Sequence, residues 1–259
     1  MDVLNISIAL VGGLIAGVIN VLAGNGSAIT LLILTELLGL PPNVANGSNR
    51  LGVFSGSATA AGIFYNKGQL KVFSNFHIVL PAFIGAAIGV WTATQVSNEQ
   101  FLWVFKIMLV VMLLVILINP KRWLIKTDIA KKVSPFLLWP LFLGIGFYGG
   151  FIQMGMGIIF LAAMVLGAKY SIIDANVIKT WIVSLYTLLC IVIFQYKGLI
   201  SWPEGLVLAI GQSVGGIIAA NFAVSHPKAN LWAYRLLVVI VLWAILRLFG
   251  FFSWVLQLI

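Results

Sequence analysis

The stretch AGNGSAITLLILTELLGL, residues 23–40, breaks an apolar run with glycines and then stays apolar only over 27–40. A helix that crosses about 30 Å of hydrocarbon needs roughly 20 residues, so 27–40 is too short to span as a straight helix. The pattern returns later, where MGMG at 154–157 precedes a short apolar segment, 157–168. The sequence therefore predicts two short helices, each following a glycine break.

Composition places these breaks in a membrane. Apolar residues make up 62% of the 259 residues and charged residues 8%, whereas about a quarter of a soluble domain is charged. The single cysteine, Cys190, excludes an internal disulfide and a cysteine metal cluster. We predict an all-α polytopic membrane protein with apolar segments at 5–23, 27–40, 44–65, 74–96, 100–118, 135–153, 157–168, 172–195, 203–224 and 229–252.

Basic residues indicate the orientation. The net charge of +9 sits mainly in short loops, as in topology signals, and five cations crowd into 119–134. Cytoplasmic loops carry such excesses, so this loop is predicted to be cytoplasmic. Counting segments from it places both termini outside the cytoplasm of a bacterial-type plasma membrane. The start, MDVLNISIALVGG, lacks a basic region and is predicted to be a first membrane segment, not a signal peptide.

The chain resembles itself at a distance of about 130 residues. AGVIN (16–20) is similar to GGFIQ (149–153), GNG (24–26) to GMG (155–157), and ANGSNR (45–50) to ANVIKT (175–180). We predict two five-segment repeats, 1–118 and 135–259, joined by a basic cytoplasmic linker, 119–134. An odd number of segments gives the repeats inverted topology. Chance similarity between apolar sequences is the alternative interpretation.

Inverted repeats with broken helices are typical of secondary transporters, whose sites lie near the membrane midplane between the repeats. A break frees backbone N–H groups, which must face a cavity or protein because lipid cannot satisfy them. The helix that follows presents its positive N-terminal end there, which favours an anion.

Arg50 is the charge that needs an explanation. It shares a helix face with Asn46 and Asn49, and burying it costs about 2.5–3.5 kcal/mol. We expect it to face a watery cavity and an anion, since its planar fork can bind two oxygens at once. The predicted substrate-binding residues are Arg50, Asn46, Asn49, Asn20, Gly24, Gly26, Ser27, Gln153, Gly155, Gly157, Asn176, Lys179 and Thr180. Snorkelling of Lys179 and interhelical hydrogen bonding by Asn20 and Gln153 are the structural alternatives.

At these motifs the chain resembles the TauE/SafE family of sulfite and organosulfonate exporters. The resemblance lies in GGLIAGVINVLAGNGS (12–27), NVANGSNRLG (43–52), GFYGGFIQMGMG (146–157) and DANVIKT (174–180). It implies a plasma-membrane permease for small sulfur oxyanions or organosulfonates, driven by protons. Members commonly have AGGGG at the first break, where this chain has Asn25 and Ser27 in place of glycines.

We therefore expect a proton-coupled exporter that binds sulfite or an organosulfonate between its repeats. Its expected partners are a small anion, membrane lipids and protons; no enzyme activity, cofactor, metal or nucleic acid is expected, and the oligomeric state is left open. A passive small-anion channel, an importer of another oxyanion and a membrane accessory subunit are the alternatives.

Overall fold

The structure is a computed structural model. It describes residues 1–70, 76–117, 135–168 and 170–226, together with residues 228, 229, 231, 232, 235, 236, 238, 239, 242 and 246. The predicted linker 119–134 and most of the predicted segment 229–252 lie outside the described residues. All regular structure in the described part is helical, which confirms the prediction of an all-α membrane protein.

Helices of the first half follow the predicted segments closely. They are α1 (Val3–Ala23), α2 (Gly26–Leu32), the π-helical turn η1 (Ile33–Leu37), α3 (Pro42–Asn66), α4 (Phe76–Ala93) and α5 (Asn98–Leu117). Together α2 and η1 form the short helix expected at 27–40. Pro42 is the first residue of α3. A backbone N–H at that position has no partner within the helix, so proline, which has no N–H, fits there without losing a hydrogen bond.

The second half runs through the same series of elements. They are α6 (Pro135–Phe151), α7 (Met156–Ala162), the π-helical turn η4 (Ala163–Gly167), α8 (Ile172–Tyr196) and α9 (Trp202–Ser225). Here α7 and η4 form the short helix expected at 157–168. Among the described residues, α1, α8 and α9 are long and apolar enough to cross a membrane.

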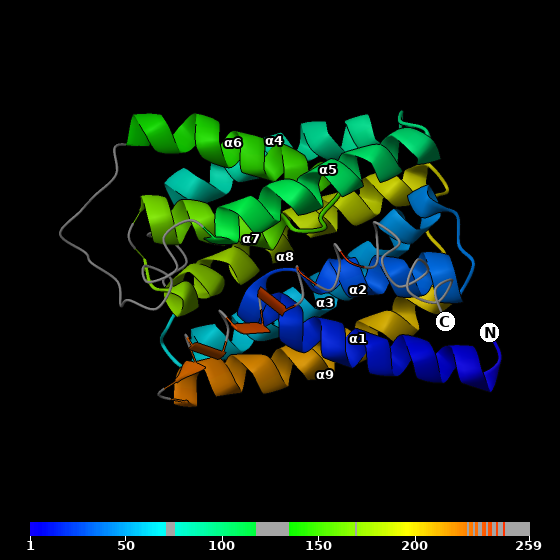
Figure 1. Ribbon diagram of the computed structural model, residues 1–259, viewed down its shortest axis with the longest axis horizontal. Helices are drawn as coiled ribbons and strands as arrows, with labels where there is room; N and C mark the ends of the chain where they lie inside the picture. The colour runs from blue at the N-terminus through cyan, green and yellow to red at the C-terminus, as the bar shows by residue number, and fades with distance from the viewer. Residues whose placement is uncertain are drawn as a thin grey trace.

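The helices lie side by side, with α4 and α6 on one side of the molecule and α1 and α9 on the other (Figure 1). The close packing of the two helices within each pair depends on glycines. A methyl group on Gly17 of α1 would lie 2.8 Å from Cα of Gln212 in α9, and one on Gly146 of α6 would lie 2.7 Å from Cα of Ala82 in α4. Small residues let helix backbones approach closely, as is common in membranes. The helices α2, α3, α7 and α8 lie between these pairs (Figure 1).

The two breaks meet in the middle of this arrangement. Gly24 ends α1 with a φ of 81°, and Gly155 precedes α7 with a φ of 72°, values that side chains disfavour. Gly24 and Gly157 approach each other so closely that a methyl group on Gly24 would lie 2.7 Å from the carbonyl carbon of Gly157. The chain thus brings its two predicted breaks into direct contact.

Candidate functional site

Arg50 is fully buried and binds the C-terminal end of α6, in the other half of the chain. Its Nη1 donates to the carbonyl oxygen of Gly149 at 2.6 Å and to Oε1 of Gln153 at 2.8 Å. Its Nη2 donates to the carbonyl oxygen of Gly150 at 2.8 Å and to Oδ1 of Asn46 at 3.2 Å. The last carbonyl groups of a helix lack partners within it and carry partial negative charge. The guanidinium supplies those partners for α6.

Lys179 makes matching contacts with the C-terminal end of α1. Its Nζ donates to the carbonyl oxygen of Asn20 and to Oδ1 of Asn176, both at 2.5 Å, and lies 3.5 Å from the carbonyl oxygen of Val21. Asn176 Nδ2 also donates to the carbonyl oxygen of Leu22 at 2.7 Å. Lys179 is only 2% exposed, so the ammonium is held inside the protein and does not snorkel to the surface.

The two sets of contacts correspond residue by residue. Asn46 Nδ2 donates to the carbonyl oxygen of Phe151 at 3.0 Å, as Asn176 does to that of Leu22. The acceptors in α6 each lie 129 residues after their counterparts in α1. A cation in each half thus binds the broken helix of the other. The division into two repeats and their inverted membrane orientation stay predictions.

The contacts correct the predicted pairing of Asn20 with Gln153. Asn20 lies in the last turn of α1 and offers its carbonyl oxygen, whose counterpart in α6 belongs to Gly149. Gln153 follows the end of α6 with a φ of 62°, and its Oε1 accepts from Arg50 and, at 2.9 Å, from the Tyr186 hydroxyl. The predicted match of AGVIN (16–20) to GGFIQ (149–153) has a spacing of 133 residues, whereas the contacts give 129. The sequence alignment was therefore four residues out of register.

The observed environment of Arg50 also differs from the expected one. The fully buried side chain faces helix-end carbonyl groups and the Phe194 ring, 5.4 Å from Cζ. Both Nη atoms have protein partners, whereas Nε has none. The fork that was expected to bind an anion is engaged with α6 in this structure. A direct role of Arg50 in anion binding stays a prediction.

The first break holds buried polar atoms without partners. They are both side-chain atoms of Asn25, Oγ of Ser27 and Nδ2 of Asn49. Thr30 Oγ1 donates to Oδ1 of Asn49 at 2.6 Å, which ties α2 to α3 and leaves the Asn49 amide nitrogen free. Leaving such groups buried and unpaired costs about 1–3 kcal/mol each. The first break is therefore a place where a hydrogen-bonding ligand or water would be stabilised.

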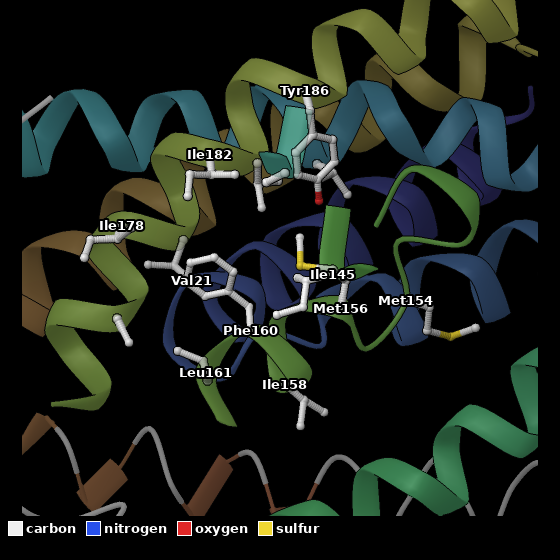
Figure 2. Close-up of a cluster of buried hydrophobic side chains, with 14 of the residues drawn as sticks. Val21, Ile145, Met154, Met156, Ile158, Phe160, Leu161, Ile178, Ile182 and Tyr186 are labelled. Atoms are coloured by element: carbon white, nitrogen blue, oxygen red, sulfur yellow. The ribbon is translucent and has the colours of Figure 1, made fainter. Parts of the chain in front are cut away.

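The second break is apolar by comparison. Figure 2 shows Met154, Met156, Ile158 and Phe160 in a cluster of buried hydrophobic side chains. At the spacing of 129 residues, Met154 and Met156 stand where the first break has Asn25 and Ser27. The two breaks thus resemble each other in backbone and differ in chemistry, with the unpaired polar side chains on the first.

Of the other predicted site residues, Gly24, Gly26, Gly155 and Gly157 lie at the breaks. Thr180 is not part of the polar set, because its hydroxyl donates to the carbonyl oxygen of Val177 in its own helix at 2.9 Å.

Sequence analysis missed Asn25, Thr30 and Tyr186 as members of the site. Asn25 had a usable signal, since it replaces a glycine in the pattern the chain resembles. Thr30 and Tyr186 had none, because hydroxyl groups on apolar helices are common and their partners, Asn49 and Gln153, are distant in sequence.

Comparisons with known proteins identify a family of membrane transporters. The sequence model of the family described as "Sulfite exporter TauE/SafE" matches residues 9–248. The chain is 26% identical to "Probable membrane transporter protein ORF9" of Sinorhizobium sp, over 83% of this chain and 82% of that one. It is 26% identical to a "Probable membrane transporter protein" of Haemophilus influenzae, over 83% and 84% of the two chains.

A third relative is the "Probable membrane transporter protein YfcA" of Escherichia coli K12, 23% identical over 83% of this chain and 79% of that one. No solved structure matches the chain.

Proposed function

This chain belongs to the sulfite exporter TauE/SafE family of membrane transporters, and from that premise we propose that it exports sulfite or an organosulfonate with proton coupling. The observation that carries the proposal is the set of buried, unpaired donors at the first break. Because these donors lie inside a membrane protein, a ligand must reach them through the protein and not from lipid.

Charge favours an anion there. The two buried charged side chains of the described residues, Arg50 and Lys179, are both cations, whereas no carboxylate is buried in that part of the chain. Fixed positive charge in a low-dielectric interior attracts anions and disfavours cations. A small oxyanion would give Arg50 and Lys179 a negative partner that the described residues do not supply.

We propose that Asn25 Nδ2, Ser27 Oγ and Asn49 Nδ2 donate to the anion, near the N-terminal end of α2. Arg50 supports binding through its charge and its unpaired Nε. Neutral donors suit sulfite and sulfonates, because each donor can bind a different oxygen of the same anion. No further charged group then has to be buried. The close contact between Gly24 and Gly157 supports a site at the junction of the two halves.

Ser27→Ala and Asn49→Ala should each weaken anion binding about ten- to a hundred-fold, since one hydrogen bond to a charged group is worth roughly 1.5–3 kcal/mol. Calorimetric titration of purified protein with sulfite and with methanesulfonate measures this. Ser184→Ala is the matched control, because its buried hydroxyl donates to Trp181 in its own helix. Wild-type affinity in both break variants would place the anion elsewhere.

Flux in proteoliposomes tests the transport mechanism. A carrier shows saturable methanesulfonate flux, whereas a passive channel shows flux that rises in proportion to concentration. Loss of flux in Asn49→Ala with normal flux in Ser184→Ala would connect transport to the first break.

The proposed orientation places both termini outside the cytoplasm, on the basis of the cations at 119–134. We expect fusions at Ile259 to a reporter that works only outside the cytoplasm to be active, and fusions within 119–134 to be inactive. Activity of a cytoplasm-only reporter at Ile259 would overturn this orientation.

A further inference from the structure

Arg50 and Lys179 hold corresponding helix ends with different chemistry. Both are buried and donate to carbonyl oxygens in the last turn of a broken helix. A guanidinium remains protonated in proteins, whereas a lysine ammonium can give up a proton and has this role in many enzymes. If a cation at this position only had to hold a helix end, arginine would serve in both halves. The lysine gives one end a group that can exchange protons.

The surroundings of Lys179 are neutral. Its three acceptors are two carbonyl oxygens and one amide oxygen. Within their bounds, α1, α7 and η4, which all pack near α8, contain no ionisable residue. The ionisable residues of the other elements that contact α8, and of α8 itself, are Arg50 and Tyr65 in α3, His77 in α4, Tyr148 in α6, and Asp174, Tyr186, Cys190 and Tyr196 in α8.

None of these residues gives the ammonium a buried counter-ion. Asp174 lies in the first turn of α8, where the Ser171 hydroxyl donates to its carboxylate at 2.8 Å. Arg50 lies against Phe194, fifteen residues beyond Lys179 and so roughly 22 Å along α8 at 1.5 Å per residue. A buried cation without a counter-ion inside a membrane protein is a candidate for a proton carrier or ligand partner.

We propose that Lys179 takes up and releases the proton that is coupled to anion transport, an inference that rests on the proposed function. The protonated amine holds the end of α1 and places positive charge beside the first break, so it favours bound anion. Proton and anion therefore move in the same direction, and each cycle carries less net charge than the anion alone. Each exported anion takes a proton out with it, so the outward gradient of the anion drives export and an inward proton gradient opposes it.

Loss of the proton from Lys179 also changes the hydrogen bonds at the end of α1. The ammonium has three N–H donors for its three oxygen acceptors. When one proton passes to water, the neutral amine keeps two N–H donors and gains a lone pair. One acceptor oxygen then faces that lone pair, which is repulsive, so the hold on the last turn of α1 loosens. Proton release is thereby linked to movement of the first break, which follows directly after α1.

The experiment compares wild type with Lys179→Arg, which keeps the cation and its donors but cannot release a proton. Methanesulfonate is the probe, because it stays ionised throughout the neutral range and any titration then belongs to the protein. We expect a gradient of one pH unit to change wild-type accumulation by up to about ten-fold, the limit for one proton per anion. Lys179→Arg should bind the anion but accumulate it equally with or without the gradient.

Lys197→Arg is the control, since that lysine is exposed and lies 5.0 Å from the Trp91 ring centroid. It should keep wild-type coupling. Gradient-dependent accumulation by Lys179→Arg would overturn the inference. Failure of wild type to bind or move methanesulfonate or sulfite would overturn the proposed function itself, a distinct result.

A measurement on wild type covers the case in which Lys179→Arg does not fold. Methanesulfonate is added to the detergent-purified protein in weak buffer with a pH-sensitive dye. We expect proton uptake with saturable dependence on the anion concentration, approaching one proton per protein. Buried lysines titrate anywhere from about pH 5 up to the value of a free lysine, about pH 10. Saturable anion binding without proton uptake across that whole range would contradict the assignment.

Discussion

Replacing Arg50 by alanine is expected to cost about 3–5 kcal/mol of stability, the range seen when one partner of a buried charged network is removed. The variant loses four hydrogen bonds and leaves the carbonyl oxygens of Gly149 and Gly150 buried without that donor. It also leaves a cavity beside Phe194. Thermal unfolding in detergent should show a midpoint lower by roughly 10 °C, or no folded protein at all.

Arg50→Lys should recover more than half of that loss. Lys179 already holds the corresponding end of α1 with three donors, so a lysine at position 50 can hold α6 in the same way. Lys67→Ala is the control, an exposed cation at the end of the same helix, with an expected change within about 0.5 kcal/mol. If Arg50→Ala unfolds at the wild-type temperature, the guanidinium does not hold α6.

These stability effects decide how anion binding can be tested. A loss of transport in Arg50→Ala would not show that Arg50 binds the anion, because the end of α6 would be disturbed as well. Ser27 is the better probe, since its Oγ has no partner to lose, whereas Asn49→Ala also removes the acceptor of the Thr30 hydroxyl. The site is therefore best examined through its unpaired donors, and Arg50 through its lysine variant.

The helices and both breaks could be predicted from sequence. Apolar length limits a membrane helix, and glycine interrupts it, so 27–40 and 157–168 stand out as short by composition alone. The structure places these helices at Gly26–Leu37 and Met156–Gly167. Local sequence decides such features, which is why the predicted bounds agree within a few residues.

The partner of Arg50 could not be predicted in the same way. Sequence shows that a buried cation needs compensation, and an anionic ligand and a helix end both provide it. The choice depends on a contact across 99 residues, between α3 and the end of α6. Spacing within α3 likewise placed Asn46 and Asn49 on one face, although Asn46 turns to α6 and Asn49 to α2. Tertiary contacts, and not the periodicity of α3, assign these side chains.

Gly157→Ala is expected to abolish transport with a smaller cost in stability than Arg50→Ala. The new methyl group would lie 2.5 Å from Cα and 2.7 Å from the carbonyl carbon of Gly24. Both are backbone atoms that cannot rotate away, and Gly24 is fixed by its φ of 81°. Overpacking of this kind costs about 1–3 kcal/mol and moves backbone.

The movement falls on the contact between the two breaks, next to Asn25 and Ser27. A shift of about 1 Å there would misplace the donors proposed for the anion, which can cost on the order of 100-fold in rate. Gly167→Ala is the matched control, because it lies in η4, directly after α7, with nothing within 4 Å of an added methyl group. Methanesulfonate flux should be lost in the first variant and kept in the second, with both proteins monodisperse. Normal flux in Gly157→Ala would mean that the two breaks can separate without affecting transport, and the anion would then have to cross elsewhere than at their junction.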